Sequence, residues 1–404
     1  MEMLPGKFGN NVRGGHLSME VRLKNQDFSI VKFVPAAQIR RLWKGMIVFM
    51  FDISFYRGKR VLVTGHTGFK GAWLCAMLKE AGADVTGYAL KPPTDPSLFM
   101  LSHMDERVRS TIGDIRDYDS LRAIFHEVRP EIVFHLAAQP IVRDSYKEPR
   151  YTFETNVMGT VNILECIREC ECVKSFLNIT TDKVYYNDER KVGFTEDMML
   201  DGFDPYSNSK SCSELVTHSY KNSFFEDGRT AVSTARAGNV IGGGDFAVDR
   251  IIPDCIRAAS RGKKIVVRNP HSIRPFQHVL EPLYVYLMIA EKQYEDIRFS
   301  GYYNVGPDDV DCVTTGTLTD IFCELWGEGQ SWENQWDGGP HEAGFLKLNC
   351  DKLKRTFSWL PVWGIRTAVE KTVDWSKAVL SGEDAYEIMV KQMREYAQDA
   401  AKQK

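Results

Sequence analysis

The sequence predicts an α/β fold, in which a parallel β-sheet carries helices on both faces and a smaller lobe follows toward the C-terminus. From Arg60 onward, short continuous apolar runs alternate with longer amphipathic segments. Such runs are typical of strands that are buried on both faces, as in a parallel sheet. A glycine-rich turn follows the first run, and the alternation ends after Gly242. These observations together favour a doubly wound sheet followed by a separate lobe.

Six strands are expected in the first part of the chain, each as an apolar run. They are "RVLVTG" (60–65), "DVTGYAL" (84–90), "RVRSTIGDI" (107–115), "EIVFHLAA" (131–138), "SFLNITT" (175–181) and "AVSTARAGNV" (231–240). The segments between them have helical spacing. Helices are expected at 69–82, where Gly82 ends the helix, then up to about Val128, at about 146–170, and from about Tyr206.

The alternation predicts a cofactor-binding domain over residues 50–240 and a substrate-binding lobe over residues 241–404. In the lobe, "RIIPDCIRAASRG" (250–262) is expected to be helical and "KIVVRN" (264–269) to be a strand. Residues 1–49 fit neither part, because they lack a sustained period. We expect them to be a disordered N-terminal extension that precedes a start near Met50. A targeting arm is the alternative, since these residues carry eight Lys or Arg against three acids.

Composition excludes several classes of protein. The 404 residues are 43% hydrophobic and 26% charged, which is ordinary for a globular protein. A net charge of −3 gives no electrostatic reason to expect nucleic acid or an anionic membrane as a partner. The early apolar run "GMIVFMF" (45–51) is too short to cross a bilayer.

The nine cysteines are scattered and odd in number, so no disulfide framework is expected. This favours a reducing, cytoplasmic location. Cys166, Cys170 and Cys172 form the closest cluster. Because no fourth ligand stands at zinc spacing, we expect the end of a packed helix here and no metal site.

The turn "VTGHTGFKG" places Gly65, Gly68 and Gly71 between the first strand and its helix. In a Rossmann-like fold, these glycines permit a tight turn, let a diphosphate approach the backbone, and let the helix pack closely on the strand. The second strand ends in Ala89 where an acid usually holds the ribose hydroxyls. This leaves NAD and NADP open, since the nearby Lys91 could meet a 2′-phosphate.

Two groups of reactive residues follow the fifth strand. Tyr206 and Lys210 lie four residues apart, which places them on one face of a helix. A lysine ammonium beside the phenol would favour the phenolate, so that Tyr206 could act as a base. Thr181, Asp182 and Lys183 stand where the fifth strand meets its loop, and ligands bind at this edge of such sheets. They are either an ordinary strand end or a second acid and base facing the same substrate.

Seven motifs together resemble the extended short-chain dehydrogenase/reductases, and among these the nucleotide-sugar 4,6-dehydratases that act on CDP-glucose. The motifs are "VTGHTGFKG", "FHLAAQP", "TTDKVY", "YSNSK", "ARAGNVIGGGD", "RPFQHVLEPL" and "YYNVGP". The resemblance runs from about Met50 to the C-terminal helices. His66, Lys183 and the "RPFQHV" motif favour the CDP-glucose enzymes over those for dTDP-glucose, which usually have Glu after the Asp.

The resemblance implies a redox cycle without net oxidation. Tyr206, aided by Lys210 and Thr181, would take the C4 hydroxyl proton while NAD takes the hydride. Lys183 would remove the C5 proton, and Asp182 would protonate the departing C6 hydroxyl. The alternatives are a nucleotide-sugar 4-epimerase, which needs no Asp–Lys pair, and a non-catalytic NAD-binding regulator, which typically lacks Tyr or Lys.

The resemblance also implies binding residues and an assembly. Residues of the glycine turn, of the next strand ends and of the reactive helix would hold NAD: Gly65, Thr67, Gly68, Phe69, Lys70, Gly71, Asp114, Ile115, Leu136, Ala137, Ala138, Thr155, Tyr206 and Lys210. Polar residues around the cleft would hold the nucleotide-sugar: Gln139, Arg143, Asn239, Arg250 and Arg274. Helices near 146–170 and after 206 would pair across a two-fold axis, giving a homodimer or a dimer of dimers.

Overall fold

The computed structural model describes residues 53–189, 191–335 and 345–403. The chain divides into two units, Met1–Phe51 and Asp52–Lys404, and all described residues belong to the second. The extension predicted at residues 1–49 lies outside the described residues.

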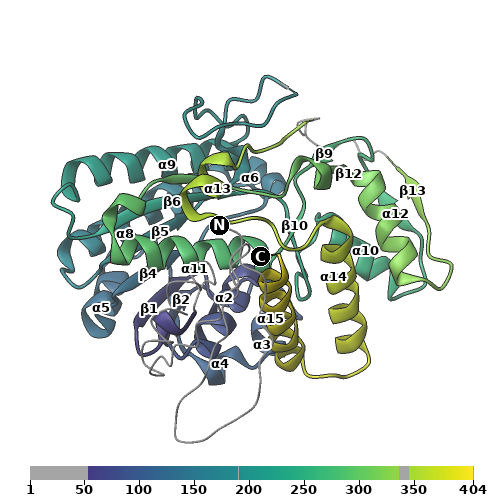
Figure 1. The fold of residues 1–404 in the computed structure, drawn as a ribbon, viewed down its shortest axis with the longest axis horizontal. Coiled ribbons are helices and arrows are strands. Elements are labelled where there is room, and N and C mark those ends of the chain that lie inside the picture. The colour runs from purple at the N-terminus through teal and green to yellow at the C-terminus, as the bar shows by residue number, and fades with distance from the viewer. Residues whose placement is uncertain (1–52, 190, 336–344, 404) are drawn as a thin grey trace, which may run out of the picture. The chain divides into compact units, whose positions relative to one another are not determined.

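A seven-stranded parallel sheet forms the centre of this unit, in the order β3-β2-β1-β4-β5-β6-β11 (Figure 1). Its strands are β1 (Arg60–Thr64), β2 (Asp84–Ala89), β3 (Arg109–Ile112), β4 (Ile132–His135), β5 (Ser175–Ile179), β6 (Ala231–Ala237) and β11 (Tyr302–Val305). Because the strand order reverses between β1 and β4, the ligand crevice of such a sheet lies at their carboxyl ends. The predicted Rossmann-like, doubly wound fold is confirmed.

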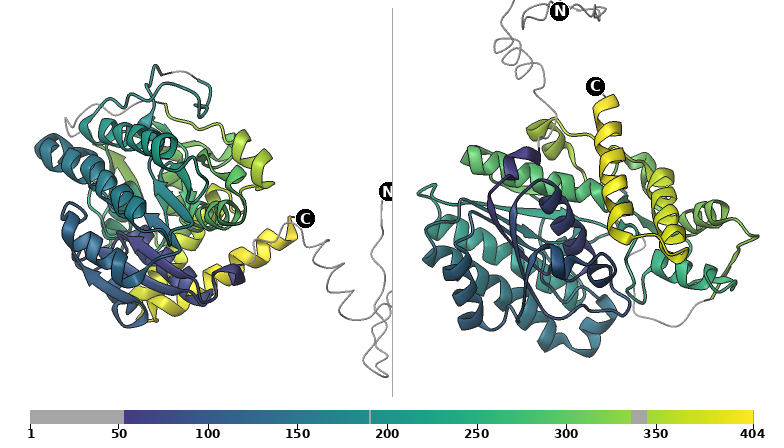
Figure 2. Two further views of the ribbon diagram at one scale, coloured as in Figure 1. Left: turned by 90° about the vertical axis from the view of Figure 1, so that its left-hand side faces the viewer. Right: turned by 90° about the horizontal axis from the view of Figure 1, so that it is seen from below.

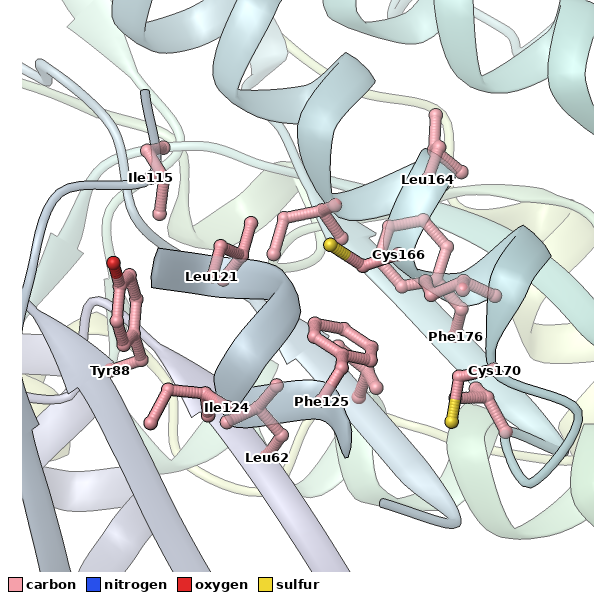
Figure 3. Close-up of a cluster of buried hydrophobic side chains, with 14 of the residues drawn as sticks. Leu62, Tyr88, Ile115, Leu121, Ile124, Phe125, Leu164, Cys166, Cys170 and Phe176 are labelled. Atoms are coloured by element: carbon pink, nitrogen blue, oxygen red, sulfur yellow. The ribbon is translucent and has the colours of Figure 1, made fainter. Parts of the chain in front are cut away.

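One face of the sheet is covered by α5 (Tyr118–Val128), α8 (Gly159–Glu169) and α9 (Pro205–Phe224). Figure 3 shows how α5 and α8 pack against the strands through buried apolar side chains. The cluster includes Leu62, Phe125, Leu164 and Phe176. Its removal from water is the main favourable contribution to folding on this face.

The other face is covered by α2 (Phe69–Glu80) and α11 (Leu280–Glu295), which contact each other. The C-terminal helix α15 (Ala385–Lys402) contacts α2, so the end of the chain covers the first helix of the sheet (Figure 2).

The long helical segment predicted over about 146–170 is present, with one break and one change of helix type. It comprises α6 (Val142–Lys147), α7 (Pro149–Phe153), the π-helical turn η2 (Glu154–Met158) and α8. Pro149 occupies the first turn of α7, where the missing N–H costs nothing, but proline cannot continue a helix from α6. The predicted long helical segment is therefore present over 149–169, with a break before Pro149 and a π-helical turn within it.

Beyond β6 the chain forms a smaller lobe with its own core. Its helices α10 (Ile251–Ala259), α12 (Thr315–Trp326) and α14 (Ile365–Leu380) pack around buried residues such as Ile252, Phe322 and Val369. Three two-stranded sheets accompany them and pair β7 (Val240–Ile241) with β10 (Gln277–His278), β9 (Ile273–Arg274) with β12 (Val313–Thr314), and β8 (Ile265–Val267) with β13 (Trp332–Asn334).

The lobe does not take up the whole chain after residue 240, because α11 and β11 return to the sheet. The division of the chain at residue 240 stays a prediction. α11 and β11 are two elements beyond that residue that pack with the sheet. Short elements complete the unit: η1 (Ile53–Tyr56), α3 (Leu98–Leu101), α4 (Met104–Arg107), η3 (Asp182–Val184), η4 (Ile297–Phe299), η5 (Asp309–Asp311) and α13 (Asp351–Phe357).

One cysteine pair differs from the sequence expectation. Cys170 and Cys172 are joined by a disulfide just after α8, with their Cα atoms 5.5 Å apart. The chain turns immediately after the helix, which brings the two side chains together. The other seven cysteines are free.

Candidate functional site

The glycine turn between β1 and α2 has a shape that only glycine fits at two positions. Gly65 has a φ of 77°, and a Cβ there would lie 2.7 Å from the backbone nitrogen of Ala137. At Gly71, a Cβ would lie 2.1 Å from the carbonyl oxygen of Gly65. These atoms belong to the backbone and cannot move aside. The two glycines therefore allow a tight turn that leads directly into the helix N-terminus, where a diphosphate binds in this fold.

Neighbouring strand ends enclose this turn. The hydroxyl of Thr67 donates a hydrogen bond to the carbonyl of Leu90, 2.9 Å away, beyond the end of β2. On the other side, the N–H groups of Leu136 and Ala137 donate to the carbonyl and hydroxyl oxygens of Thr64, at 3.1 and 3.3 Å. The predicted residues Leu136–Ala138 thus lie beside the glycine turn, at the point where the strand order reverses.

Asp114 and Ile115 follow β3 and differ in their surroundings. Ile115 is buried in the core below the site. The carboxylate of Asp114 pairs with Arg116 at 2.6 Å, and hydrogen bonds from this side chain lower its pKa. Thr155 in the π-helical turn is buried, and its hydroxyl has no hydrogen-bond partner among the described residues. A buried hydroxyl without a partner is costly, so it is a good candidate for ligand contact.

The residues after β5 form a compact acid–base group. The hydroxyl of Thr181 caps η3 and donates to Oδ1 of Asp182 at 3.0 Å. Nζ of Lys183 lies 3.2 Å from the same oxygen and 3.5 Å from Oδ1 of Asn239. The carboxyl of Asp182 is fully buried, whereas 29% of the Lys183 side chain is exposed. The structure thus brings together four residues that the sequence placed on two separate segments.

The second oxygen of Asp182 lies close to Gly238. Oδ2 is buried and has no hydrogen-bond partner within the described part of the chain. It lies 2.6 Å from the position that a Cβ at Gly238 would take. Glycine is therefore the residue that allows the carboxyl to sit at the end of β6.

Replacing Gly238 by alanine should push the Asp182 carboxyl out of position, because the added methyl would overlap Oδ2. We expect turnover to fall on the order of 10²-fold, as for a displacement of about 1 Å at a reacting group. Gly306→Ala is the matched control. It follows β11, the neighbouring strand, and its Cβ would meet nothing closer than 3.6 Å. Equal activity losses in the two variants, at equal melting temperature, would contradict this assignment.

Tyr206 and Lys210 lie in the first turns of α9. This helix begins at Pro205, and the side chain of Asp204 caps it by accepting the N–H of Ser207 at 3.0 Å. Burial raises the pKa of Tyr206 to about 12, and a hydrogen bond with Thr181 opposes this rise. Burial lowers the pKa of Lys210 to about 8. Its ammonium donates to the carbonyl of Ile179, at the end of β5, at 3.1 Å.

A buried ion pair behind these residues was missed by sequence reasoning. Glu214 and Arg236 are both fully buried and lie 2.9 Å apart. Burial alone would raise the pKa of Glu214, but Arg236 and hydrogen bonds lower it to about 2. Glu214 also accepts the hydroxyls of Thr180 and Thr234, which fixes the end of β5 and the middle of β6 relative to α9. An arginine inside the apolar run of β6 was the available signal.

The predicted substrate residues lie in different surroundings. The side chain of Gln139 donates to Thr152 at 2.9 Å and accepts the N–H of Ile141, so the protein already uses both ends of its amide. Arg274 is buried on β9 and donates to the carbonyl of Ile273. The roles proposed for both in substrate binding stay predictions.

One of the predicted arginines, Arg143, lines a cavity of about 380 Å³ together with Tyr146, Lys147 and Asp249. Arg250 follows Asp249 and pairs with Asp245 at 3.0 Å. Basic side chains around such a cavity suit an anionic ligand. A larger cavity of about 500 Å³ lies elsewhere, at Tyr302 and Lys352, and none of the predicted site residues line it.

The described residues contain no cluster of three or more His, Cys, Asp or Glu arranged to hold a metal ion. Nor does any described helix combine the length and apolarity needed to cross a bilayer.

Comparisons of the sequence with known proteins find similarity to nucleotide-sugar 4,6-dehydratases. Residues 62–306 match the family described as GDP-mannose 4,6 dehydratase. A CDP-glucose 4,6-dehydratase of Salmonella typhimurium is 48% identical over 341 residues, covering 83% of this chain and 95% of the relative.

Solved structures share the fold at lower identity. UDP-glucose 4-epimerase of Thermotoga maritima, bound to UDP-glucose, superposes with a TM-score of 0.69 at 22% identity, covering 79% of this chain and 99% of that one. The dTDP-glucose 4,6-dehydratase of Bacillus anthracis, in complex with NAD, gives 0.67 at 21% identity, covering 81% and 99%.

Proposed function

Because the chain belongs to the GDP-mannose 4,6-dehydratase family, we propose that it is an NAD-dependent hydro-lyase that converts CDP-glucose to CDP-4-keto-6-deoxyglucose. The high identity to the Salmonella typhimurium enzyme supports the choice of substrate. The observation that carries the reaction type is the 3.2 Å contact between Asp182 and Lys183, beside the hydroxyl of Thr181, which donates to Asp182 at 3.0 Å. Oxidation of an alcohol needs one base, whereas elimination of water needs a second base and an acid.

The residues around the glycine turn fit a dinucleotide. Gly65 and Gly71 let backbone segments pack closely in the turn, Gly68 leaves space beside it, and the buried hydroxyl of Thr155 has no hydrogen-bond partner among the described residues. When bound, NAD would supply the acceptor and later the donor of one hydride. Ala89, at the end of β2, carries no acid for the ribose, so a preference for NAD over NADP rests on the family resemblance.

Tyr206 would take the proton of the C4 hydroxyl. Its buried phenol has a raised pKa of about 12, so it needs help to lose its own proton. Thr181 offers that help by hydrogen bonding, and the buried ammonium of Lys210 lies one helical turn away on α9. Thr181 also donates a hydrogen bond to Asp182 at 3.0 Å, so it belongs to the elimination group as well.

Lys183 and Asp182 would carry out the elimination together. As an ion pair, an ammonium and a carboxylate have the wrong protonation states to act as base and acid. One proton passed from Nζ to Oδ1 across 3.2 Å gives a neutral amine and a carboxylic acid, which are the forms needed at C5 and C6. No proton has to come from solvent for this change.

The direct test is incubation of the protein with CDP-glucose and NAD⁺, followed by measurement of the near-ultraviolet absorbance that 4-keto sugars develop in alkali. We expect the absorbance to appear, and to be weaker with dTDP-glucose or UDP-glucose. Formation of CDP-galactose without that absorbance would instead establish a 4-epimerase.

Assembly into a homodimer, or a dimer of dimers, is a further part of this proposal. Large apolar side chains are exposed on the helices that would pair: Met158 is 51% exposed beside α8, and Leu215 is 52% exposed on α9. Their burial between two copies would add to stability. Light scattering at micromolar concentration should give at least twice the chain mass of 46.0 kDa. A monomer mass would contradict the prediction.

The cytoplasmic location also belongs to this proposal and is supported by the seven free cysteines.

A further inference from the structure

Glu214 is a buried carboxylate on α9, one helical turn beyond Lys210, and its two oxygens have different partners. Oε1 accepts the hydroxyl of Thr180, which directly follows β5. Oε2 accepts an N–H of Arg236 at 2.9 Å and the hydroxyl of Thr234 at 2.8 Å, and both of these residues are on β6. One side of the carboxylate therefore holds the end of β5 and the other side holds β6.

Lys210 is anchored to the same end of β5. Its buried ammonium donates a hydrogen bond at 3.1 Å to the carbonyl of Ile179, the last residue of the strand. Because Ile179 and Thr180 are consecutive, two side chains one turn apart on α9 hold two adjacent residues of the chain. A shift of Thr180 would therefore also move the carbonyl that holds the ammonium.

The charges that face Lys210 come from three elements. Burial lowers the pKa of Lys210 to about 8, and Glu214 acts in the opposite sense. Lys70 on α2 repels the ammonium. Burial lowers the pKa of His135 on β4 to about 3, so this ring is uncharged at neutral pH. Among the described residues, Glu214 is the only acid that acts on the pKa of Lys210.

The negative charge of Glu214 is itself held in place. Its pKa is lowered to about 2 by Arg236 and by hydrogen bonds, so the carboxylate is ionised wherever the protein is folded near neutral pH. Nε2 of His218, one turn further along α9, lies 3.2 Å from Oε2, on the same side as Arg236. These partners all meet Oε2, and Oε1 stays directed at the end of β5.

We propose that Glu214 positions Lys210 for the first proton transfer, by holding the end of β5 through Oε1 and by stabilising the ammonium with its negative charge. This inference rests on the proposed function, because it assumes that the Lys210 ammonium helps Tyr206 to lose its proton. A neutral amine could not stabilise the phenolate. Oxidation at C4 should therefore slow as the pH rises and Lys210 loses its charge.

Glu214→Gln should shift this loss of activity to lower pH. Removing a nearby negative charge lowers the pKa of a lysine, by about one unit or more, so that the ammonium is lost closer to neutrality. The measurement is the rate of NADH formation in a single turnover with CDP-glucose and NAD⁺, as a function of pH. Glu214→Asp keeps the charge on a shorter side chain. It should keep the alkaline limb near its wild-type pH, even if the rate itself is lower.

Two threonine variants test the contact without breaking the ion pair, and they decide the question if Glu214→Gln does not fold. Thr180→Val removes the hydroxyl at Oε1, and Thr234→Val removes the one at Oε2. Both threonines are buried, and each variant loses one hydrogen bond to the same carboxylate, so their melting temperatures should fall alike. Thr180→Val should slow NADH formation roughly tenfold, the effect of about one hydrogen bond, whereas Thr234→Val should stay near the wild-type rate.

An alkaline limb that stays at the wild-type pH in Glu214→Gln would overturn the inference. Equal rates of NADH formation in the two threonine variants would overturn it as well, because they would show a purely structural role. A wild-type protein that forms no NADH from CDP-glucose and NAD⁺ would refute the proposed function itself, and the inference would fail with it.

Discussion

Replacing Lys183 by methionine should leave oxidation at C4 intact and stop the elimination of water. Methionine keeps the length of the side chain but removes the amine, so the Asp182 carboxyl loses its proton donor at 3.2 Å. We expect overall turnover to fall on the order of 10²–10⁴-fold, the usual contribution of one proton-transfer group. The measurement is single-turnover absorbance of NADH, which should appear and persist, combined with solvent deuterium exchange at C5 of recovered substrate, which should be lost.

Two further variants make this result specific. Tyr206→Phe should slow the first step itself, so that little NADH appears. Lys174 is an exposed lysine immediately before β5 begins, at the opposite end of the strand from Lys183. Lys174→Met should therefore behave like the wild-type protein. Normal turnover of Lys183→Met would return the Asp182–Lys183 pair to an ordinary strand end and reopen the 4-epimerase alternative.

Replacing Gly71 by alanine should cost both stability and cofactor binding. The added methyl would lie 2.1 Å from the carbonyl oxygen of Gly65 and 2.7 Å from Cα of His66. Because both atoms are backbone, α2 must move away from β1, at a cost of about 1–3 kcal/mol or more. Thermal unfolding should show a lower melting temperature, and NADH fluorescence should show little binding.

Gly68→Ala separates these two effects in the same turn. Its Cβ would meet only the Gly65 carbonyl oxygen, at 3.4 Å, which is an ordinary contact. The protein should therefore fold with a normal melting temperature, while its affinity for the dinucleotide falls, because the methyl occupies the space that the diphosphate needs. A Gly68→Ala variant with unchanged affinity would show that the diphosphate does not approach this residue.

The parallel sheet was predictable because its strands are buried on both faces and read as continuous apolar runs. All six strands predicted between residues 60 and 240 are present, each within a few residues of its expected ends. The seventh, β11 at Tyr302–Val305, lies after the alternation has ended and was not predicted as part of the sheet. Its position depends on contacts with β6, and no local pattern encodes such contacts.

The site was predictable to the extent that its chemistry lies in short motifs at strand ends. Thr181, Asp182 and Lys183 are adjacent in sequence, and parallel strands bring their carboxyl ends to one edge, so their meeting with Asn239 follows from the topology. The ion pair between Glu214 and Arg236 could not be predicted in the same way, because one residue lies on a helix and the other on a strand, and these meet only in the folded chain. The sequence places Lys210 on the helix face nearest Tyr206, but its hydrogen bond to Ile179 is a tertiary contact.

The sequence predicted the details of the helices less completely than the positions of the strands. The break between α6 and α7 at Pro149 was visible in the sequence, but the π-helical turn that follows was not. This turn adds a residue to the helical repeat and so reorients the side chains before α8. It carries Thr155, whose hydroxyl lacks a protein partner among the described residues.

The return of β11 to the sheet makes the two parts of the chain interdependent. A fragment ending near residue 240 would lack β11, the neighbour of β6, and α11, which covers the same face of the sheet as α2. The edge of β6 would then be open to pairing with other chains. Fragments of this kind tend to aggregate instead of folding. The smaller lobe is accordingly built from segments on both sides of β11, with α10 before this strand and α12 and α14 after it. The lobe and the sheet should therefore unfold in a single cooperative transition.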